Sequence, residues 1–156
     1  MQLSLHADYA LRVLVYVGTH RERLVTTEEI SRAYGISRHH LVRVVQTLAS
    51  SNYLEIRTGR SGGVSLKLEP DDIRLGDVVR VAEPNMRLVE CFDRSTNTCI
   101  IAPVCALKGM LRDALEAFLD SLNQNTLADI IQNSGAEKLA STFVKLTGWN
   151  PPATKQ

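Results

Sequence analysis

The part of the sequence that most constrains the fold is a pair of short helix patterns separated by a glycine. The first pattern begins at Thr26 or Thr27 and ends at Gly35, because hydroxyl side chains cap helix N-termini and glycine accepts the left-handed backbone that ends a helix. The second begins at Ser37 and continues through RHHLVRVVQTLASSNY, where apolar residues recur with helical spacing. Two short helices joined by a tight turn predict a helix-turn-helix.

The segments on either side extend this pattern into a larger unit. Residues 4–20 carry another helix pattern, with Ser4 as its N-cap. After Asn52 the sequence alternates apolar and polar residues in LEIRTG and GVSLKLE, on either side of the loop TGRSGG, which predicts a β-hairpin. A hairpin in that position is a wing, so we expect a winged helix-turn-helix domain over residues 1–70.

The sequence of residues 71–132 predicts a second region, which follows the winged helix-turn-helix domain. IRLGDVVRVAE and TLADIIQ are short helix patterns, and Pro103 suits the first turn of a long helix over about residues 103–123. The wide apolar stripe of the long helix is typical of a dimer interface. Residues 133–156 are polar, and we expect them to form a mobile tail. The predicted fold class is mainly α with a small β-hairpin wing, followed by a long C-terminal dimerisation helix.

Charge is distributed unevenly, although the net charge of the chain is only +1. From Arg32 to Lys67 the only acid is Glu55, and the remaining charged residues of this stretch are basic. A basic block in a near-neutral chain indicates a polyanionic partner.

The predicted fold places candidate DNA-contacting residues on two elements. The second helix of a helix-turn-helix enters the major groove, and its N-terminal residues face base edges and phosphates. The candidates there are Ser37, Arg38, His39, His40 and Arg43. The candidates in the wing are Arg57, Arg60, Ser61 and Gly62. We favour DNA over a winged helix used only for protein contacts, and a homodimer predicts a palindromic double-stranded operator.

The N-terminal residues are apolar but lack the basic head and cleavage site of a signal peptide. No apolar run approaches the roughly 18 residues needed to span a bilayer. We therefore expect a cytoplasmic protein with reduced thiols and no membrane contact.

All the cysteines of the chain, Cys91, Cys99 and Cys105, lie within CFDRSTNTCIIAPVC. An odd number cannot close into disulfides within one chain. Zinc sites usually have cysteine pairs separated by two to four residues, which makes zinc the weaker interpretation of this spacing. The spacing alone leaves an iron–sulfur cluster and a thiol redox switch open.

Several segments together carry a resemblance to a known family. HADYALRVLVYV, EEISRAYGISRHHLVRVVQTL, GRSGGVSL, IRLGDVVR and three cysteines before a long helix are similar to the IscR/NsrR family of iron–sulfur transcription regulators. The match covers nearly the whole chain except the tail. The details most resemble the nitric-oxide-sensing repressors of the family.

The resemblance also implies a cofactor and its ligands. Family members of one type use a histidine three residues after the last cysteine, but this chain has Lys108 there. Nitric-oxide-sensing members carry an aspartate in the first helix, which corresponds to Asp8, and this carboxylate can come from the partner subunit. The implied group is a [4Fe–4S] cluster, with [2Fe–2S] as the other form, held by the three cysteines and Asp8.

The implied function is a repressor that releases its operator when nitric oxide nitrosylates the cluster, and so controls nitric oxide detoxification genes. The alternatives are a regulator of iron–sulfur biogenesis and a thiol redox sensor without a stable cluster. An electron carrier would not need the basic helix-turn-helix. The sequence has no nucleophile–base constellation or nucleotide-binding loop, so we expect no enzyme.

Overall fold

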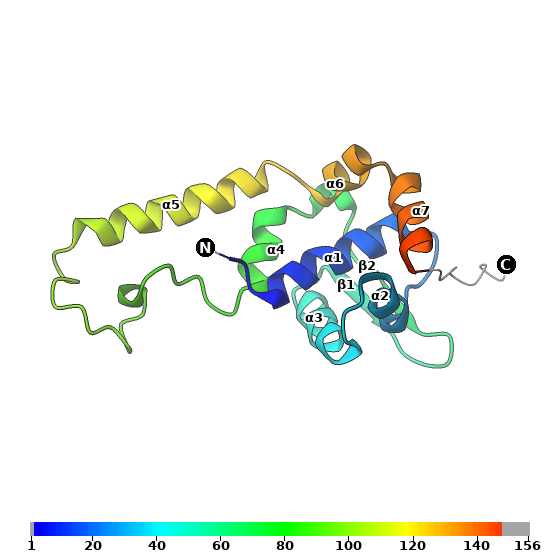
Figure 1. Ribbon diagram of the computed structural model, residues 1–156, viewed down its shortest axis with the longest axis horizontal. Helices are drawn as coiled ribbons and strands as arrows, with labels where there is room; N and C mark the ends of the chain where they lie inside the picture. Colours follow the sequence, from blue (N-terminus) through cyan, green and yellow to red (C-terminus); the bar gives the residue numbers. More distant parts are fainter. Residues whose placement is uncertain (1, 148–156) are drawn as a thin grey trace.

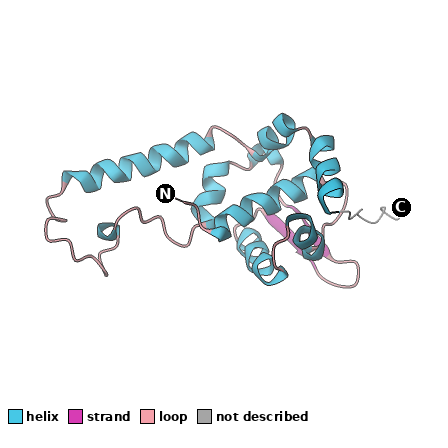
Figure 2. Ribbon diagram, viewed as in Figure 1, coloured by secondary structure: helices cyan, strands magenta, loops and turns pink. Residues whose placement is uncertain are grey.

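The computed structural model describes residues 2–147. Its elements form one lobe, from which α5 and the segment before it extend as an arm (Figure 1). The helices are α1 (Leu5–Thr19), α2 (Thr27–Tyr34), α3 (Arg38–Ser50), α4 (Leu75–Ala82), α5 (Ala106–Asn123), α6 (Leu127–Ser134) and α7 (Ala136–Thr147), with short 3₁₀ turns η1 (Pro70–Asp72) and η2 (Glu90–Phe92). Strands β1 (Leu54–Arg57) and β2 (Gly63–Leu66) form one antiparallel hairpin (Figure 2). The predicted fold class is confirmed.

The helix boundaries follow from the capping side chains. The Ser4 hydroxyl accepts a hydrogen bond from the Ala7 amide at the start of α1. Thr26 and Glu29 form a reciprocal capping box at the start of α2, and Gly35 ends α2 with a φ of 65°. Ser37 caps α3 through the amide of His40. Because each cap removes an unpaired amide at a helix start, α2 and α3 begin where the sequence predicts.

One hydrophobic core holds the lobe together. Helix α1 runs through its centre and contacts α3, α4, α6, α7 and β2. The largest fully buried side chains of this core include Leu14 and Tyr16 of α1, and Leu41 and Leu48 of α3. Helix α3 therefore rests on α1 along one face.

The wing is attached to the helix-turn-helix by backbone hydrogen bonds. Val25 and Val64 exchange two of these bonds, with N···O distances of 2.9 and 2.7 Å. A Cβ atom at position 63 would lie 2.8 Å from the Val25 carbonyl oxygen, so only glycine fits beside this bridge. The wing and α2 are consequently parts of one rigid unit.

Helix α5 is anchored to the lobe through α4. Val79, Leu115 and Leu119 form a second, smaller core cluster between the two helices. Asn123 binds Asp77 twice, accepting from the Asp77 amide and donating to its carboxylate at 3.0 Å each. The N-terminal half of α5 extends beyond these contacts (Figure 1).

Two boundaries differ from the sequence prediction. Helix α5 begins at Ala106, with Cys105 as its N-cap residue, so Pro103 lies in the preceding turn and not in the first helical turn. The expected mobile tail from residue 133 is wrong for residues 136–147, which form α7 and pack on α1, α2 and α6. Residues 133–135 also belong to described structure, as the last two residues of α6 and its C-cap, whereas residues 148–156 of the expected tail lie outside the described residues. Within residues 2–147, no helix has the length and apolarity needed to cross a membrane.

Candidate DNA interface and cysteine site

Helix α3 presents a polar face to solvent. Leu41, Val44, Val45 and Leu48 are its buried side chains. Because a helix has 3.6 residues per turn, the side chains on the opposite face are exposed. The exposed side chains of α3 are Arg38, His39, His40, Val42, Arg43, Gln46 and Ser50.

An open cavity of 740 Å³ lies between α2, α3 and the wing. Arg38, Val42 and Gln46 line it from α3, and Arg57 and Arg60 line it from the wing. The side chains of α2 contribute Thr27 and Glu28. This cavity therefore brings together predicted contacts from both elements.

The other side of α3 faces the start of α1. His40 and Arg43 line a smaller cavity of 160 Å³ with Leu5, His6, Tyr9 and Val44. The ring centroids of His40 and Tyr9 are 6.2 Å apart. The predicted residues of α3 thus divide between a wing side, with Arg38, and an α1 side, with His40 and Arg43.

The wing loop exposes its two arginines. Arg57 and Arg60 are both exposed, and the only ion pair of the two within the described residues joins Arg57 to Glu55 at 3.8 Å. Gly59 has a φ of 110°, and its carbonyl accepts a hydrogen bond from the Gly62 amide at 3.0 Å. A Cβ atom at Gly62 would collide with the Arg57 carbonyl, so Gly62 shapes the turn. Ser61 is exposed at the tip.

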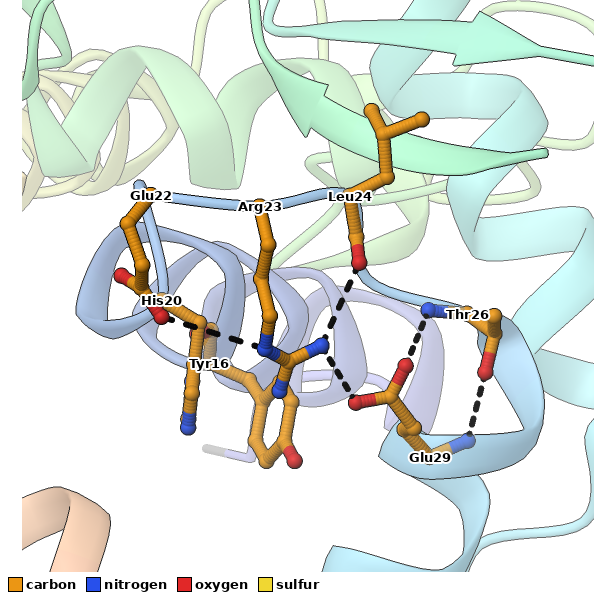
Figure 3. Close-up of polar contacts among 7 residues, drawn as sticks. All are labelled: Tyr16, His20, Glu22, Arg23, Leu24, Thr26 and Glu29. Carbon is orange, nitrogen blue, oxygen red and sulfur yellow. Dashed lines mark hydrogen bonds and ion pairs between the residues drawn. The ribbon is translucent and has the colours of Figure 1, made fainter. Parts of the chain in front are cut away.

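A buried ion pair fixes the start of α2 (Figure 3). Arg23 and Glu29 have side chains only 10% and 6% exposed, and their Nη1 and Oε1 atoms lie 2.7 Å apart. Glu29 also accepts from the Thr26 amide at 2.8 Å. The neighbouring Tyr16 is buried, and burial raises its pKa to about 12. The loop before α2 is therefore held to the helix by the contact between Arg23 in the loop and Glu29 in the first turn of α2.

The three cysteines are free thiols at separate points of the arm. Cys91 is buried in η2, whereas Cys99 and Cys105 are half-buried. Asp8 lies on α1 and pairs with Arg12 at 2.7 Å. Within residues 2–147, no three His, Cys, Asp or Glu side chains come together in a group able to hold a metal ion. One described subunit therefore does not assemble the predicted ligand set.

Local hydrogen bonds shape the loop between Cys91 and Cys99. Asp93 accepts from the hydroxyl and the amide of Ser95, at 2.7 and 2.9 Å, and pairs with Arg87 at 2.6 Å. The hydrogen bonds from Ser95 contribute most to lowering the pKa of the Asp93 carboxyl, and the charge of Arg87 lowers it further. The Cys99 amide donates to Asn97 at 3.1 Å. The loop backbone is thus ordered without using the thiols.

The chemistry around Cys105 suits an anionic group. Arg94, Lys108 and Arg112 line a 480 Å³ hollow together with Cys105. Thiolate-ligated iron–sulfur clusters carry net negative charge, which nearby cations stabilise. Three thiols and a carboxylate are also ligand types that iron accepts. The donor set therefore fits a cluster, although a single subunit does not gather it.

The end of the arm exposes apolar side chains. We call these residues the 100–110 surface: Ile100, Ile101, Val104, Leu107 and Met110, which are 94, 55, 85, 58 and 65% exposed. Several exposed large apolar side chains in one segment are typical of a protein interface. It adjoins Cys99 and Cys105 in sequence, so a covering partner would also reach the thiols.

Two residues of the cavity wall, Val42 and Gln46, and the buried Arg23–Glu29 pair were not predicted from the sequence. Val42 and Gln46 follow Arg38 at intervals of four residues, and this helical spacing was the signal that could have identified them. The Arg23–Glu29 pair joins a loop to a helix, and no periodic pattern identifies such a contact.

Comparisons with known proteins agree with this architecture. Residues 3–133 match the family model described as Rrf2, iron-dependent transcriptional regulator. The HTH-type transcriptional regulator NsrR of Bacillus subtilis is 42% identical over 134 residues, which cover 85% of this chain and 92% of that protein. NsrR of Bacillus licheniformis is 43% identical over 134 residues, with coverage of 85% and 94%.

Solved structures have the same fold. T. potens IscR superposes with a TM-score of 0.68 at 21% identity, covering 88% of this chain and 91% of that one. CymR, titled the global cysteine regulator of B. subtilis, superposes with a TM-score of 0.63 at 27% identity, covering 85% and 98%.

Proposed function

The chain belongs to the Rrf2 family of transcriptional regulators, and from that premise we propose a repressor whose operator binding depends on an iron–sulfur cluster and is relieved by nitric oxide. The observation that carries the proposal is the pairing of an exposed basic recognition helix with an exposed basic wing around one cavity. The relatives named NsrR support a transcriptional regulator, and the resemblance to nitric-oxide-sensing repressors extends the proposal to the control of nitric oxide detoxification genes by a cytoplasmic protein.

DNA binding would use the two sides of the cavity differently. Helix α3 enters the major groove, where Arg38 and His39 can reach base edges. The amide groups at the start of α3 and the Ser37 hydroxyl suit a phosphate. In the wing, Arg57 and Arg60 would contact the DNA backbone or the minor groove, together with Ser61 and Gly62 of the loop between β1 and β2.

The proposed ligands of the cluster are Cys91, Cys99, Cys105 and the Asp8 carboxylate of the partner subunit. A [4Fe–4S] cluster is favoured, and a [2Fe–2S] cluster is the other form that this donor set accepts. When bound, the cluster supplies iron that reacts with nitric oxide. Asp8 is the weakest donor of the set, because a carboxylate oxygen is a hard ligand compared with a thiolate.

Asp8 is well placed to affect DNA binding. It lies on α1, beside Tyr9, which lines the cavity shared with His40 and Arg43 of α3. His6 on the same helix is hydrogen-bonded to Thr47 of α3 at 3.0 Å. A change in what Asp8 binds would therefore act on the helix that supports α3. The 100–110 surface supports a homodimer, and two-fold symmetry then favours a palindromic operator.

One observation supports a second candidate, a thiol redox sensor. The three cysteines are free and do not form a metal-binding group within the described residues. Oxidation of two of them to a disulfide would leave the third thiol free. A regulator of iron–sulfur biogenesis would share the cluster and differ in its target genes.

The test is anaerobic purification followed by iron, sulfide and zinc analysis and a visible spectrum. We expect coloured protein with iron and sulfide in near-equal amounts, and loss of both in each Cys→Ser variant. Asp8→Ala should retain some cluster but lose it faster. Glu28→Ala is the matched control, because Glu28 also pairs with an arginine four residues later. Colourless protein that contains only zinc would contradict the proposal.

A further inference from the structure

Three side chains of α3 share one side of the DNA-facing cavity. Arg38, Val42 and Gln46 follow one another at intervals of four residues, and all three line the 740 Å³ cavity. Val42 lies between the two polar side chains and is 39% exposed. Because successive turns of a helix rise about 5.4 Å, the three side chains form a row along the helix.

The packing of α3 does not account for the valine. The face of α3 that packs on the core consists of Leu41, Val44, Val45 and Leu48, and Val42 belongs to neither core cluster. An exposed β-branched residue also gains nothing in helix propensity over the polar residues around it. Its position on the cavity wall remains the feature that distinguishes it.

The chemistry of the major groove supplies a partner for such a side chain. Thymine carries the only methyl group that unmodified DNA presents there, and apolar side chains contact it. Glutamine pairs with adenine N6 and N7, and arginine pairs with guanine O6 and N7. A row of arginine, valine and glutamine therefore presents three different chemistries to neighbouring base pairs.

We propose that Val42 reads a thymine of the operator half-site through the 5-methyl group of the base, with Arg38 and Gln46 contacting base edges on either side. This inference rests on the proposed DNA-binding function and adds the base that one side chain selects. Ile56, which is 45% exposed, also lines the cavity, but it belongs to the wing. Only α3 would enter the groove, so the methyl contact is assigned to Val42.

The test uses a duplex selected by this protein from a random library. Each thymine in the duplex is replaced singly by deoxyuridine, which lacks only the methyl group, and Kd is measured by fluorescence anisotropy at fixed salt. For the unaltered protein we expect one replacement per half-site to weaken binding about fourfold, the effect of one buried methyl group. With Val42→Ala, the same replacement should have no further effect.

Val81→Ala is the matched control, because Val81 is a valine of similar exposure, 41%, on α4. This variant should keep the full sensitivity to deoxyuridine. If no single thymine matters, or if Val42→Ala stays equally sensitive, the inference is overturned while the DNA-binding function stands. If the library yields no specific duplex, the proposed function itself fails, and the two failures are thereby distinguished.

Discussion

The Arg23–Glu29 ion pair stabilises the start of α2. Both side chains are nearly buried, and Glu29 also closes the capping box of α2 with Thr26 (Figure 3). A charge removed from water is tolerated only when its partner is present. The start of the helix-turn-helix therefore depends on two buried side chains.

Replacing Glu29 by alanine should lower the free energy of unfolding by about 3 kcal/mol, because the buried Arg23 would lose its 2.7 Å partner and keep only the 3.8 Å contact with the exposed Glu22. Urea denaturation followed by circular dichroism measures this loss. Glu28→Ala is the control, since Glu28 and Arg32 form an exposed pair, and it should cost less than about 0.5 kcal/mol. Equal losses of unfolding free energy in the two variants would show that the buried pair stabilises the fold no more than the exposed pair does.

At the scale of elements, α7 is the least expected feature. It follows the segment matched by the family model, which ends at residue 133. Phe143 of α7 packs on Tyr16 and Tyr34, with ring centroids 4.9 and 5.2 Å away. Since Tyr16 is on α1 and Tyr34 is on α2, α7 joins these two helices on the side away from the arm (Figure 1).

Phe143→Ala should destabilise the fold by about 2 kcal/mol, because it removes a half-buried aromatic ring that contacts two others. Thermal unfolding provides the measurement. Lys145→Ala, an exposed substitution on the same helix, should leave Tm nearly unchanged. A Tm for Phe143→Ala equal to that of the control would mean that α7 does not stabilise the lobe.

The helix-turn-helix could be predicted from the sequence because its signals are local. Thr26, Gly35 and Ser37 act on neighbouring amides and on backbone conformation, so their effect does not depend on the rest of the fold. Helix α7 was missed because its stability comes from Phe143 packing on distant residues. The start of α5 was misplaced because Pro103 also suits a turn.

The candidate site was only partly predictable for the same reason. The residue types of Arg38, Arg57 and the cysteines indicate their chemistry directly. Their arrangement depends on tertiary contacts, such as the Val25–Val64 bridge that sets the wing beside α3. The placement of Asp8 relative to the thiols of a second subunit is not encoded in any local pattern.

In the molecule as a whole, the arm of one subunit leaves the 100–110 surface uncovered. The 100–110 surface exposes large apolar side chains beside two of the three thiols. Covering it with a second copy would bury these side chains and could bring the Asp8 carboxylate of that copy to the cysteines. Dimerisation and ligand assembly would then be one event.

Met110→Glu should weaken this dimer, because a carboxylate in an apolar interface loses its hydration without gaining a partner. Analytical ultracentrifugation should detect monomer at concentrations where the unaltered protein is dimeric. Leu68→Glu introduces the same charge at an exposed leucine outside the arm and should not change the sedimentation. A fully dimeric Met110→Glu protein would place the interface elsewhere.

Under the proposed function, the integrity of the cluster controls operator binding. The most direct test is an anaerobic titration with nitric oxide, in which operator binding by fluorescence anisotropy and the visible absorbance of the cluster are followed in the same sample. We predict that both signals fall together, and that Cys99→Ser protein binds the operator weakly at the outset. Operator affinity that stays constant while the absorbance is lost would show that DNA binding does not depend on the cluster.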